Sequence, residues 1–205
     1  MARKPHGRHR SSSERRQRIV KAALACFVEL GFANTTMEDI RRRSKASNGS
    51  IYHHFTSKEL LAAAVYLQGL IDYQTGLLAE LEHNPQAHAG VSAIVSYHLR
   101  WVTEHRDWAR YLSEMRHAEF MVTAETAIAE QNRRFVKRLI GWLQPHIENG
   151  ALRRLAPDLF ISLIIGPCQE YARLWLIGRT LTGLSTAAEE LGRAAWLAVC
   201  GPGEG

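Results

Sequence analysis

Apolar residues recur every three or four positions along most of the chain, which is the spacing of amphipathic α-helices. In the first such run, one helical face collects Ile19, Ala23, Phe27 and Leu30. Runs of this kind cover residues 12–30, 36–44, 48–54, 57–81, 87–104, 107–117, 123–148, 157–178 and 185–199. No segment keeps the strict alternation of a β-strand. We therefore expect an all-α protein of about nine helices.

The ends of the early helices carry capping signals. A capping box joins a Ser or Thr to a Glu three residues later, and it marks the start of a helix. Three such pairs are present, namely Ser11 with Glu14, Thr35 with Glu38, and Thr56 with Glu59. Ser47 is expected to cap the helix at 48–54. Gly31 follows the last apolar residue of the first helix, as a C-terminal cap does.

The two short helices at 36–44 and 48–54 form a helix–turn–helix pattern. On a helical wheel of the second, Ile51 and Phe55 share one side, and the other side carries Gly49, Ser50, Tyr52 and His53. Small residues permit close approach to DNA, while hydroxyl and imidazole groups can read base edges in the major groove. The pattern predicts a helix that inserts into a DNA groove.

Basic residues are concentrated in the first part of the chain. Residues 1–60 hold 13 Lys or Arg and 5 Asp or Glu, a net charge of +8, whereas residues 61–205 hold 13 and 15, a net charge of −2. This distribution indicates a polyanion as partner of the first part, either nucleic acid or an anionic membrane surface. Residues 1–10 are expected to form a disordered basic tail, which could also touch DNA.

Several side chains are candidates for contacts with DNA phosphates. Tyr52 can donate its hydroxyl, and Thr36 and Lys58 lie at helix starts, where free backbone N–H groups favour phosphate. The arginines at 41–43 are either further phosphate contacts or a solvated charged face. The adjacent His53 and His54 point to different sides of a helix, which disfavours a metal site.

Other classes of function lack a motif in this sequence. Cys26, Cys168 and Cys200 are far apart and no apolar leader is present, so we expect free thiols in a reducing cytoplasm. The apolar stretch 159–178 is interrupted by Pro167 and charged residues, which indicates a buried helix and no membrane span. Without a nucleophile, phosphate-loop or metal-ligand motif, no catalysis, cofactor or metal is expected. An enzyme or a membrane-surface protein with an incidental helix–turn–helix remains the alternative.

Three segments combine into a specific motif set, TTMEDI at 35–40, SNGSIYHHF at 47–55 and SKELL at 57–61. Together with Ala23, Phe27 and the pair Gly31-Phe32, they resemble the TetR family of transcriptional regulators. The resemblance implies all-helical subunits that form a homodimer and bind a palindromic operator, usually as a repressor. It also implies a C-terminal domain that binds a small ligand and dimerises through its last two helices.

With this resemblance, contacts with double-stranded DNA are expected at Thr36, Arg41, Lys45, Ser47, Asn48, Gly49, Ser50, Tyr52, His53 and Lys58. Two of these residues depart from the usual family pattern, because Arg41 replaces an Ala and Lys45 replaces the Gly of the turn. Gly accepts a positive φ freely and Lys does not. We expect either backbone strain at Lys45 or additional phosphate contacts from both side chains.

The predicted organisation is a basic tail at 1–10, a helix–turn–helix domain at 11–60 and a ligand-binding and dimerisation domain at 61–205. Candidates to line a site for a small apolar or aromatic effector are Trp101, Trp108, Tyr111, Met115, Phe135, Trp142 and Tyr171, with ordinary core packing as the alternative for each. His98, His105 and His117 are candidates to orient the ligand. The homodimer is expected to form through about 157–178 and 185–199, unless these faces belong to the intramolecular core.

Overall fold

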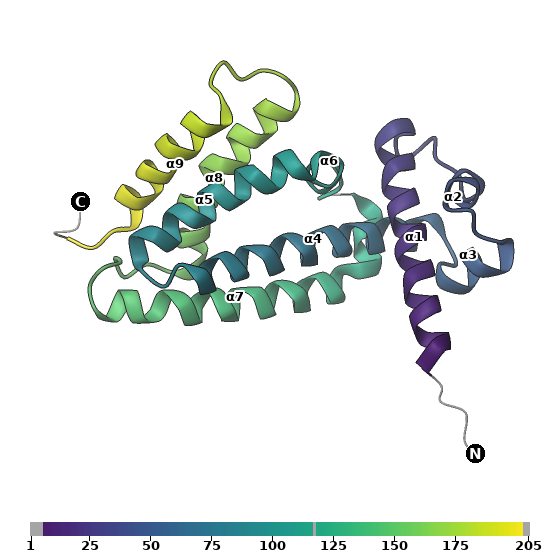
Figure 1. The fold of residues 1–205 in the computed structure, drawn as a ribbon, viewed down its shortest axis with the longest axis horizontal. Coiled ribbons are helices and arrows are strands. Elements are labelled where there is room, and N and C mark those ends of the chain that lie inside the picture. Colours follow the sequence, from purple (N-terminus) through teal and green to yellow (C-terminus); the bar gives the residue numbers. More distant parts are fainter. Residues whose placement is uncertain (1–5, 117, 203–205) are drawn as a thin grey trace. The chain divides into compact units, whose positions relative to one another are not determined.

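The computed structural model describes residues 6–116 and 118–202. This part of the chain contains nine α-helices, one short 3-10 helix and no β-strand (Figure 1). An isolated bridge between Leu152 and Cys200 is its one β-type pairing. The all-α prediction is therefore confirmed.

The helices follow the predicted order closely. They are α1 (His6–Leu30), α2 (Met37–Ser44), α3 (Asn48–His54), α4 (Lys58–His83), α5 (Ala87–Glu104), α6 (Arg106–Met115), the 3-10 helix η1 (Glu119–Ala124), α7 (Glu125–Glu148), α8 (Pro157–Leu176) and α9 (Leu184–Val199). From α2 onward the ends of the α-helices lie close to the predicted ones, while η1 was not expected. Pro145 and Pro167 lie inside α7 and α8 without interrupting either helix.

Helix α1 differs most from its prediction. It begins at His6, so Ser11 lies within the helix and cannot be its N-cap. The predicted capping box of Ser11 with Glu14 is therefore wrong. Of the predicted disordered tail, residues 6–10 are helical, and residues 1–5 lie outside the described part of the chain.

Internal contacts divide the protein into two compact units. Unit 1 contains the chain up to Leu70 together with Arg110–Ile128, and unit 2 contains Ile71–Ala109 and the chain from Ala129 onward. The division falls inside α4, α6 and α7, so each of these helices contributes to both units. It does not coincide with the functional boundary predicted at residue 60, which stays a prediction.

The core of unit 1 joins α1, α2 and α3. Ile19 and Phe27 of α1, Ile40 of α2, and Ile51 of α3 are buried together with Phe55 directly after α3. Burial of these side chains is the main source of free energy that holds such short helices in place. The predicted anchoring of α3 by its two apolar residues is confirmed.

Later segments of the chain complete unit 1. Tyr111 of α6 stacks on Phe27 with 5.7 Å between ring centroids, and its hydroxyl donates to the Ala62 carbonyl at 2.9 Å. Phe120 of η1 stacks on Phe32 with a centroid distance of 4.5 Å. The helix–turn–helix therefore shares its unit with residues far along the sequence.

In unit 2, helices α5, α8 and α9 pack against one another. The predicted dimer faces are partly used in this core, because Ile164 of α8 and both Ala195 and Trp196 of α9 are buried within the chain. Both helices therefore bury one face inside their own subunit, and dimerisation through the other faces of 157–178 and 185–199 stays a prediction.

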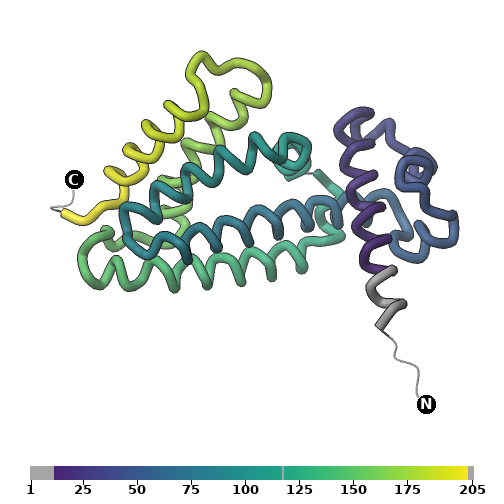
Figure 2. Tube along the Cα trace, in the orientation of Figure 1, coloured from purple at the N-terminus to yellow at the C-terminus, as the bar shows by residue number. Residues whose placement is uncertain are grey.

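The unit 2 parts of α4 and α7 run side by side (Figure 2). The buried Gln74 of α4 donates to Asn132 at 2.8 Å and accepts from Gln131 at 2.9 Å, both on α7.

None of the helices in the described residues is long and apolar enough to cross a membrane.

Candidate nucleic-acid interface

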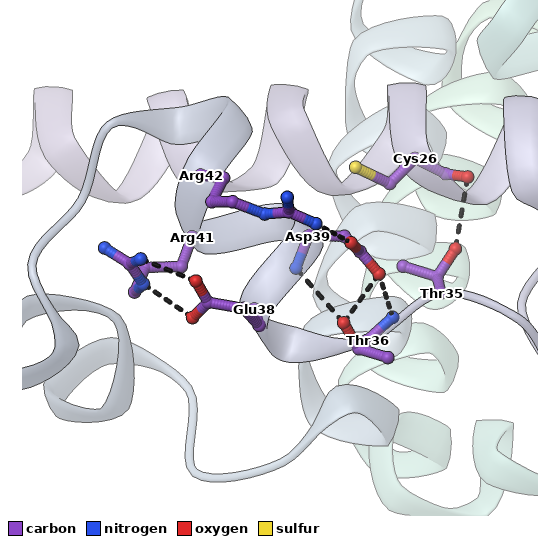
Figure 3. A network of polar contacts seen from close by, with 7 residues as sticks. All are labelled: Cys26, Thr35, Thr36, Glu38, Asp39, Arg41 and Arg42. Carbon is purple, nitrogen blue, oxygen red and sulfur yellow. Dashed lines mark hydrogen bonds and ion pairs between the residues drawn. The ribbon is translucent and has the colours of Figure 1, made fainter.

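A capping box fixes the start of α2 (Figure 3). The Thr36 hydroxyl oxygen accepts from the Asp39 backbone N–H at 3.1 Å. In return, Asp39 Oδ2 accepts from the Thr36 backbone N–H at 3.0 Å and from its hydroxyl at 2.6 Å. The predicted pair of Thr35 with Glu38 is therefore wrong by one residue.

Thr35 has a different structural task. Its side chain is buried, and its hydroxyl lies 2.8 Å from the Gly31 carbonyl oxygen. The hydroxyl also lies 3.1 Å from the Cys26 carbonyl oxygen (Figure 3). Because the hydroxyl faces the end of α1, it cannot reach the first turn of α2. Gly31 itself has φ of 79° and ends α1, as predicted.

Helix α3 begins as the sequence predicts. Ser47 is its N-cap, and the Ser47 hydroxyl accepts from the Ser50 backbone N–H at 3.3 Å. At the other end, the Phe55 N–H donates to the Ile51 carbonyl at 2.9 Å. With Ile51 and Phe55 fixed in the core, the rotation of this short helix about its axis is set.

That rotation turns four predicted DNA contacts outward. Asn48, Gly49, Tyr52 and His53 are exposed, with Tyr52 at 51%. A Cβ added at Gly49 would meet no atom of the protein, so no internal packing requires a Gly there. We call these four residues the α3 surface.

Ser50 does not belong to this surface. Its hydroxyl oxygen is buried and has no hydrogen-bond partner among the described residues. On the wheel Ser50 lies between the anchored and the exposed sides, and the structure turns its hydroxyl inward. In this conformation the hydroxyl cannot contact a base.

The turn between α2 and α3 contains a left-handed residue. Lys45 has φ of 54° and ψ of 32°, and it is the one non-glycine residue with a positive φ in the described part of the chain. This conformation closes α2, because the Ala46 N–H donates to the Arg41 carbonyl at 3.2 Å. The strain expected at Lys45 has a structural basis, since a Cβ is disfavoured in this region.

Each arginine of α2 is paired with a carboxylate. Arg41 binds Glu38 through two contacts of 2.6 and 2.7 Å, and the hydrogen bond from Arg41 lowers the pKa of Glu38. Arg42 contacts Asp39 at 2.6 Å, and Arg43 contacts Glu29 at 2.5 and 2.6 Å. These pairs match the solvated charged face that was the alternative to phosphate binding.

Lys58 is likewise engaged within the protein. Its ammonium donates to the carbonyls of Phe32 at 2.8 Å, Thr35 at 2.9 Å and Ala33 at 3.4 Å, and lies 4.5 Å from the Phe32 ring centroid. Because an ammonium has three protons, these contacts occupy its donors. In this structure Lys58 holds the loop before α2, and its phosphate contact stays a prediction.

The start of α4 also differs by one position from its prediction. The Ser57 hydroxyl accepts from the Leu60 N–H at 3.2 Å, which makes Ser57 the capping side chain. The predicted box of Thr56 with Glu59 is therefore wrong. As with Thr35 and Thr36, two residues with hydroxyl groups are adjacent. The direction of the backbone makes the second of them the cap of the helix.

The predicted ligand residues are divided between the two units. Tyr111 and Met115 belong to unit 1, whereas Trp101, Trp108, Phe135, Trp142 and Tyr171 belong to unit 2. The Tyr171 hydroxyl donates to the Thr182 carbonyl at 2.6 Å, and the Trp142 ring lies where Gly90 lacks a side chain. Tyr171 and Trp142 therefore have contacts within the protein, and the lining of an effector site by the predicted residues stays a prediction.

A polar cluster in unit 2 contains the candidates His98 and Trp101 together with Tyr73, which the sequence analysis missed. Tyr73 of α4 contacts His98 and Trp101 of α5, with its hydroxyl 2.8 Å from His98 Nδ1. The available signal was the position of His98 on an otherwise apolar helix face that also carries Val91, Ile94, Val95 and Val102. His117, another candidate from the sequence, lies outside the described residues.

Comparison with known proteins agrees with the helix–turn–helix geometry of α2 and α3. The family model described as bacterial regulatory proteins of the tetR family matches residues 19–65. The HTH-type transcriptional repressor KstR2 of Rhodococcus jostii (strain RHA1) is 30% identical over 145 residues, which are 69% of this chain and 69% of that protein.

Solved structures extend the likeness in fold to nearly the whole chain. A TetR family transcription regulator from Marinobacter aquaeolei VT8 has a TM-score of 0.77 at 18% identity, covering 95% of this chain and 100% of that one. FadR from Bacillus subtilis in complex with stearoyl-CoA has a TM-score of 0.76 at 17% identity, covering 89% and 98%. With the match to KstR2 over 69% of both chains, this protein belongs to the TetR family of transcription regulators.

Proposed function

We propose that this DNA-binding transcription regulator is a repressor that binds a palindromic operator as a homodimer and is released by a small molecule. Membership of its family makes the chain a regulator and not an enzyme. The observation that carries the proposal is the α3 surface, which is held outward by the buried Ile51 and Phe55. We place its action in the cytoplasm, where operator DNA is found.

In this proposal the α3 surface enters the major groove. His53 reads a base edge, Asn48 offers both a donor and an acceptor, and Gly49 lets the helix backbone approach the DNA. Tyr52 donates its hydroxyl to a phosphate beside the groove. The exposure of all four residues supports these roles.

Phosphate contacts are proposed around this surface at Thr36, Arg41, Lys45, Ser47 and Lys58. Arg41 and Lys58 already have partners, so each would exchange a contact inside the protein for a phosphate. Such an exchange costs part of the binding energy, which is why we assign base reading to the α3 surface and not to the arginines.

The homodimer is proposed to form through the solvent-facing sides of α8 and α9. These helices leave Leu159 and Leu197 exposed at 47% and 57%, and Leu163, Leu174 and Leu191 are only partly covered. A two-fold pairing of such faces would bury them. It would also present two copies of α3 to two half-sites, which explains a palindromic operator.

The effector is proposed to bind in unit 2 and to act through helices shared with unit 1. Because α4, α6 and α7 are continuous through both units, a shift of these helices by a ligand changes unit 1 directly. A largely apolar effector is consistent with the aromatic interior of unit 2. FadR of Bacillus subtilis, a structural neighbour, was solved with stearoyl-CoA.

Selection of bound sequences from random DNA tests the regulator directly. The full chain is expected to enrich a palindrome, and its affinity should fall steeply with salt because phosphate contacts release counterions. Enrichment of a sequence without two-fold symmetry would contradict the dimer. No enrichment at all would contradict DNA reading by α3.

The role of His53 can be separated from general binding. His53→Ala is expected to lower discrimination at one base pair of each half-site by about tenfold, with little change in affinity for random DNA. His83→Ala, which removes an exposed imidazole from unit 2, is the matched control. Equal losses on selected and random DNA would show that His53 does not read a base.

A further inference from the structure

A ring nitrogen of His98 in the core of unit 2 lacks a hydrogen-bond partner among the described residues. His98 is 7% exposed, and its Nε2 atom is buried without a hydrogen bond to any described residue. The other ring nitrogen, Nδ1, lies 2.8 Å from the Tyr73 hydroxyl oxygen. Buried polar atoms are nearly always paired, so an unpaired one requires an explanation.

The neighbouring polar groups are satisfied. The Tyr97 hydroxyl donates to the Tyr73 carbonyl at 3.1 Å, and Trp101 Nε1–H donates to Asp72 at 3.0 Å. The Tyr73 ring packs edge-on against the rings of His98 and Trp101, at centroid distances of 5.6 and 5.2 Å. Among the ring nitrogens and hydroxyl groups of these four side chains, His98 Nε2 is therefore the one that has no hydrogen bond within the described residues.

The proton positions follow from the burial of both rings. Burial lowers the pKa of His98 to about 4, so the imidazole is neutral at neutral pH and carries one N–H. Burial raises the pKa of Tyr73, so its hydroxyl keeps its proton. We assign His98 Nδ1 as the acceptor of this proton, because Nδ1 is the one hydrogen-bond partner of the Tyr73 hydroxyl among the described residues. The imidazole hydrogen then sits on Nε2, which makes this atom a hydrogen-bond donor.

We propose that His98 is the polar anchor of the effector site, and that its Nε2–H binds the uncharged carbonyl oxygen of an otherwise apolar small molecule. The aromatic rings around His98 suit an apolar body, while a single donor selects a single acceptor. A carboxylate would bring a charge into this apolar core, and an amine would offer no acceptor. This assignment rests on the proposed function of unit 2 as the effector-binding part.

The donor can be observed in the ligand-free protein. Histidine nitrogens of the ¹⁵N-labelled full chain are recorded by NMR, and His98 is identified as the signal missing from His98→Phe. The expected signal is a neutral ring protonated at Nε2, without titration from about pH 8 to about pH 5. A ring protonated at Nδ1, or one that becomes charged in this range, would overturn the proposal.

Binding is tested with probes of similar size and different head groups. The ketones 2-undecanone and cyclododecanone are titrated against the full chain, beside undecanoate and undecylamine, with tryptophan fluorescence or calorimetry as the readout. The ketones are expected to bind about tenfold more weakly to His98→Phe. His98→Gln, which keeps an N–H donor near the position of Nε2, should restore most of this loss.

His88→Phe serves as the matched control, because it makes the same substitution at an exposed histidine of the same helix, α5. It should leave ketone affinity unchanged. Absence of ketone binding, equal binding by the wild type and His98→Phe, or a preference for undecanoate would each overturn the proposal. If no ketone binds and His98→Phe melts at a higher temperature, the nitrogen is paired with an ordered water only.

These outcomes are independent of the regulator proposal, because neither measurement contains DNA. An enriched operator without ketone binding removes the His98 assignment alone. Binding of ketones that depends on His98, in a chain that selects no DNA sequence, removes the regulator proposal and leaves the site.

Discussion

The dipeptide Tyr-His occurs in both units with opposite outcomes. Tyr52 and His53 of α3 are exposed, whereas Tyr97 and His98 of α5 are 8% and 7% exposed. Helix α3 is short and is anchored only by Ile51 and by Phe55 directly after it, so Tyr52 and His53 face outward. Helix α5 carries apolar residues on most of its circumference and packs against α8 and α9.

The difference shows that the chemistry of a residue pair does not determine its use. Both dipeptides offer the same hydroxyl and imidazole groups. On α3 these groups are available to an external partner. On α5 they form an internal network with Tyr73, in which His98 Nε2 has no partner among the described residues. The neighbouring apolar residues decide between the two outcomes.

The largest expected effect concerns the acid stability contributed by His98. Because its folded pKa of about 4 lies below the ordinary 6.5, the unfolded chain binds the proton more readily and acid favours unfolding. The contribution of His98 to the free energy of unfolding is fully present above the ordinary pKa, and it is lost as the pH decreases toward 4. The loss from this one group is about 3 kcal/mol.

Urea unfolding as a function of pH measures this loss. The difference between the wild type and His98→Phe isolates His98, because the other histidines and the carboxylates are common to both. Identical pH profiles for the two chains would break the comparison, since they would mean that His98 is as accessible to water as a surface residue.

Lys58→Ala should have the next largest effect, on the support beneath the α3 surface. The change removes an ammonium that donates to the carbonyls of Phe32 and Thr35, so we expect unit 1 to lose about 2 kcal/mol of stability. Chemical unfolding measures this loss, with Glu59→Ala as the exposed neighbouring control. If the variant keeps its stability but binds all DNA sequences more weakly, the role of Lys58 is instead a contact with a DNA phosphate.

The two tyrosines of the comparison provide a matched pair of substitutions. Tyr97→Phe removes a buried hydroxyl that donates to the Tyr73 carbonyl, and should cost about 1.5 kcal/mol. Tyr52→Phe removes an exposed hydroxyl and should change stability by less than about 0.5 kcal/mol. Thermal unfolding of both variants checks the contrast. Similar costs would mean that the hydroxyl of Tyr52 also has an internal partner.

The smallest expected effect is at the turn that leads into α3. Lys45→Gly relieves a left-handed backbone conformation and should stabilise the protein by about 1 kcal/mol or less, because Gly also gains freedom in the unfolded chain. The melting temperature measures this change, and Lys45→Asn is a useful intermediate. No gain with either variant would count against strain at Lys45.

Much of the interface was predictable because its determinants are local. Helical spacing located α2 and α3, and the position of Ile51 fixed which side of α3 faces outward. The capping residues were predicted one position too early at Thr35 and Thr56, where two hydroxyl residues adjoin. Sequence spacing could not distinguish them, since the burial of Thr35 against α1 decides the first case.

The unit 2 cluster was not predictable in the same way. Tyr73 and His98 are 25 residues apart and meet only because α4 and α5 pack together. A histidine among buried aliphatic residues was visible in the sequence, but the atom left unpaired depends on the partner of its other nitrogen. The assignment of Ser50 also changed, because its hydroxyl turns inward.

The composition of unit 1 has a consequence for protein engineering. Tyr111 and Phe120 contact Phe27 and Phe32, although a long stretch of sequence separates each pair. A chimera that transplants only residues 1–60 onto another regulator would leave these aromatic partners behind. The transferable module is discontinuous, and a working graft must carry 110–128 of this chain along with its first 70 residues.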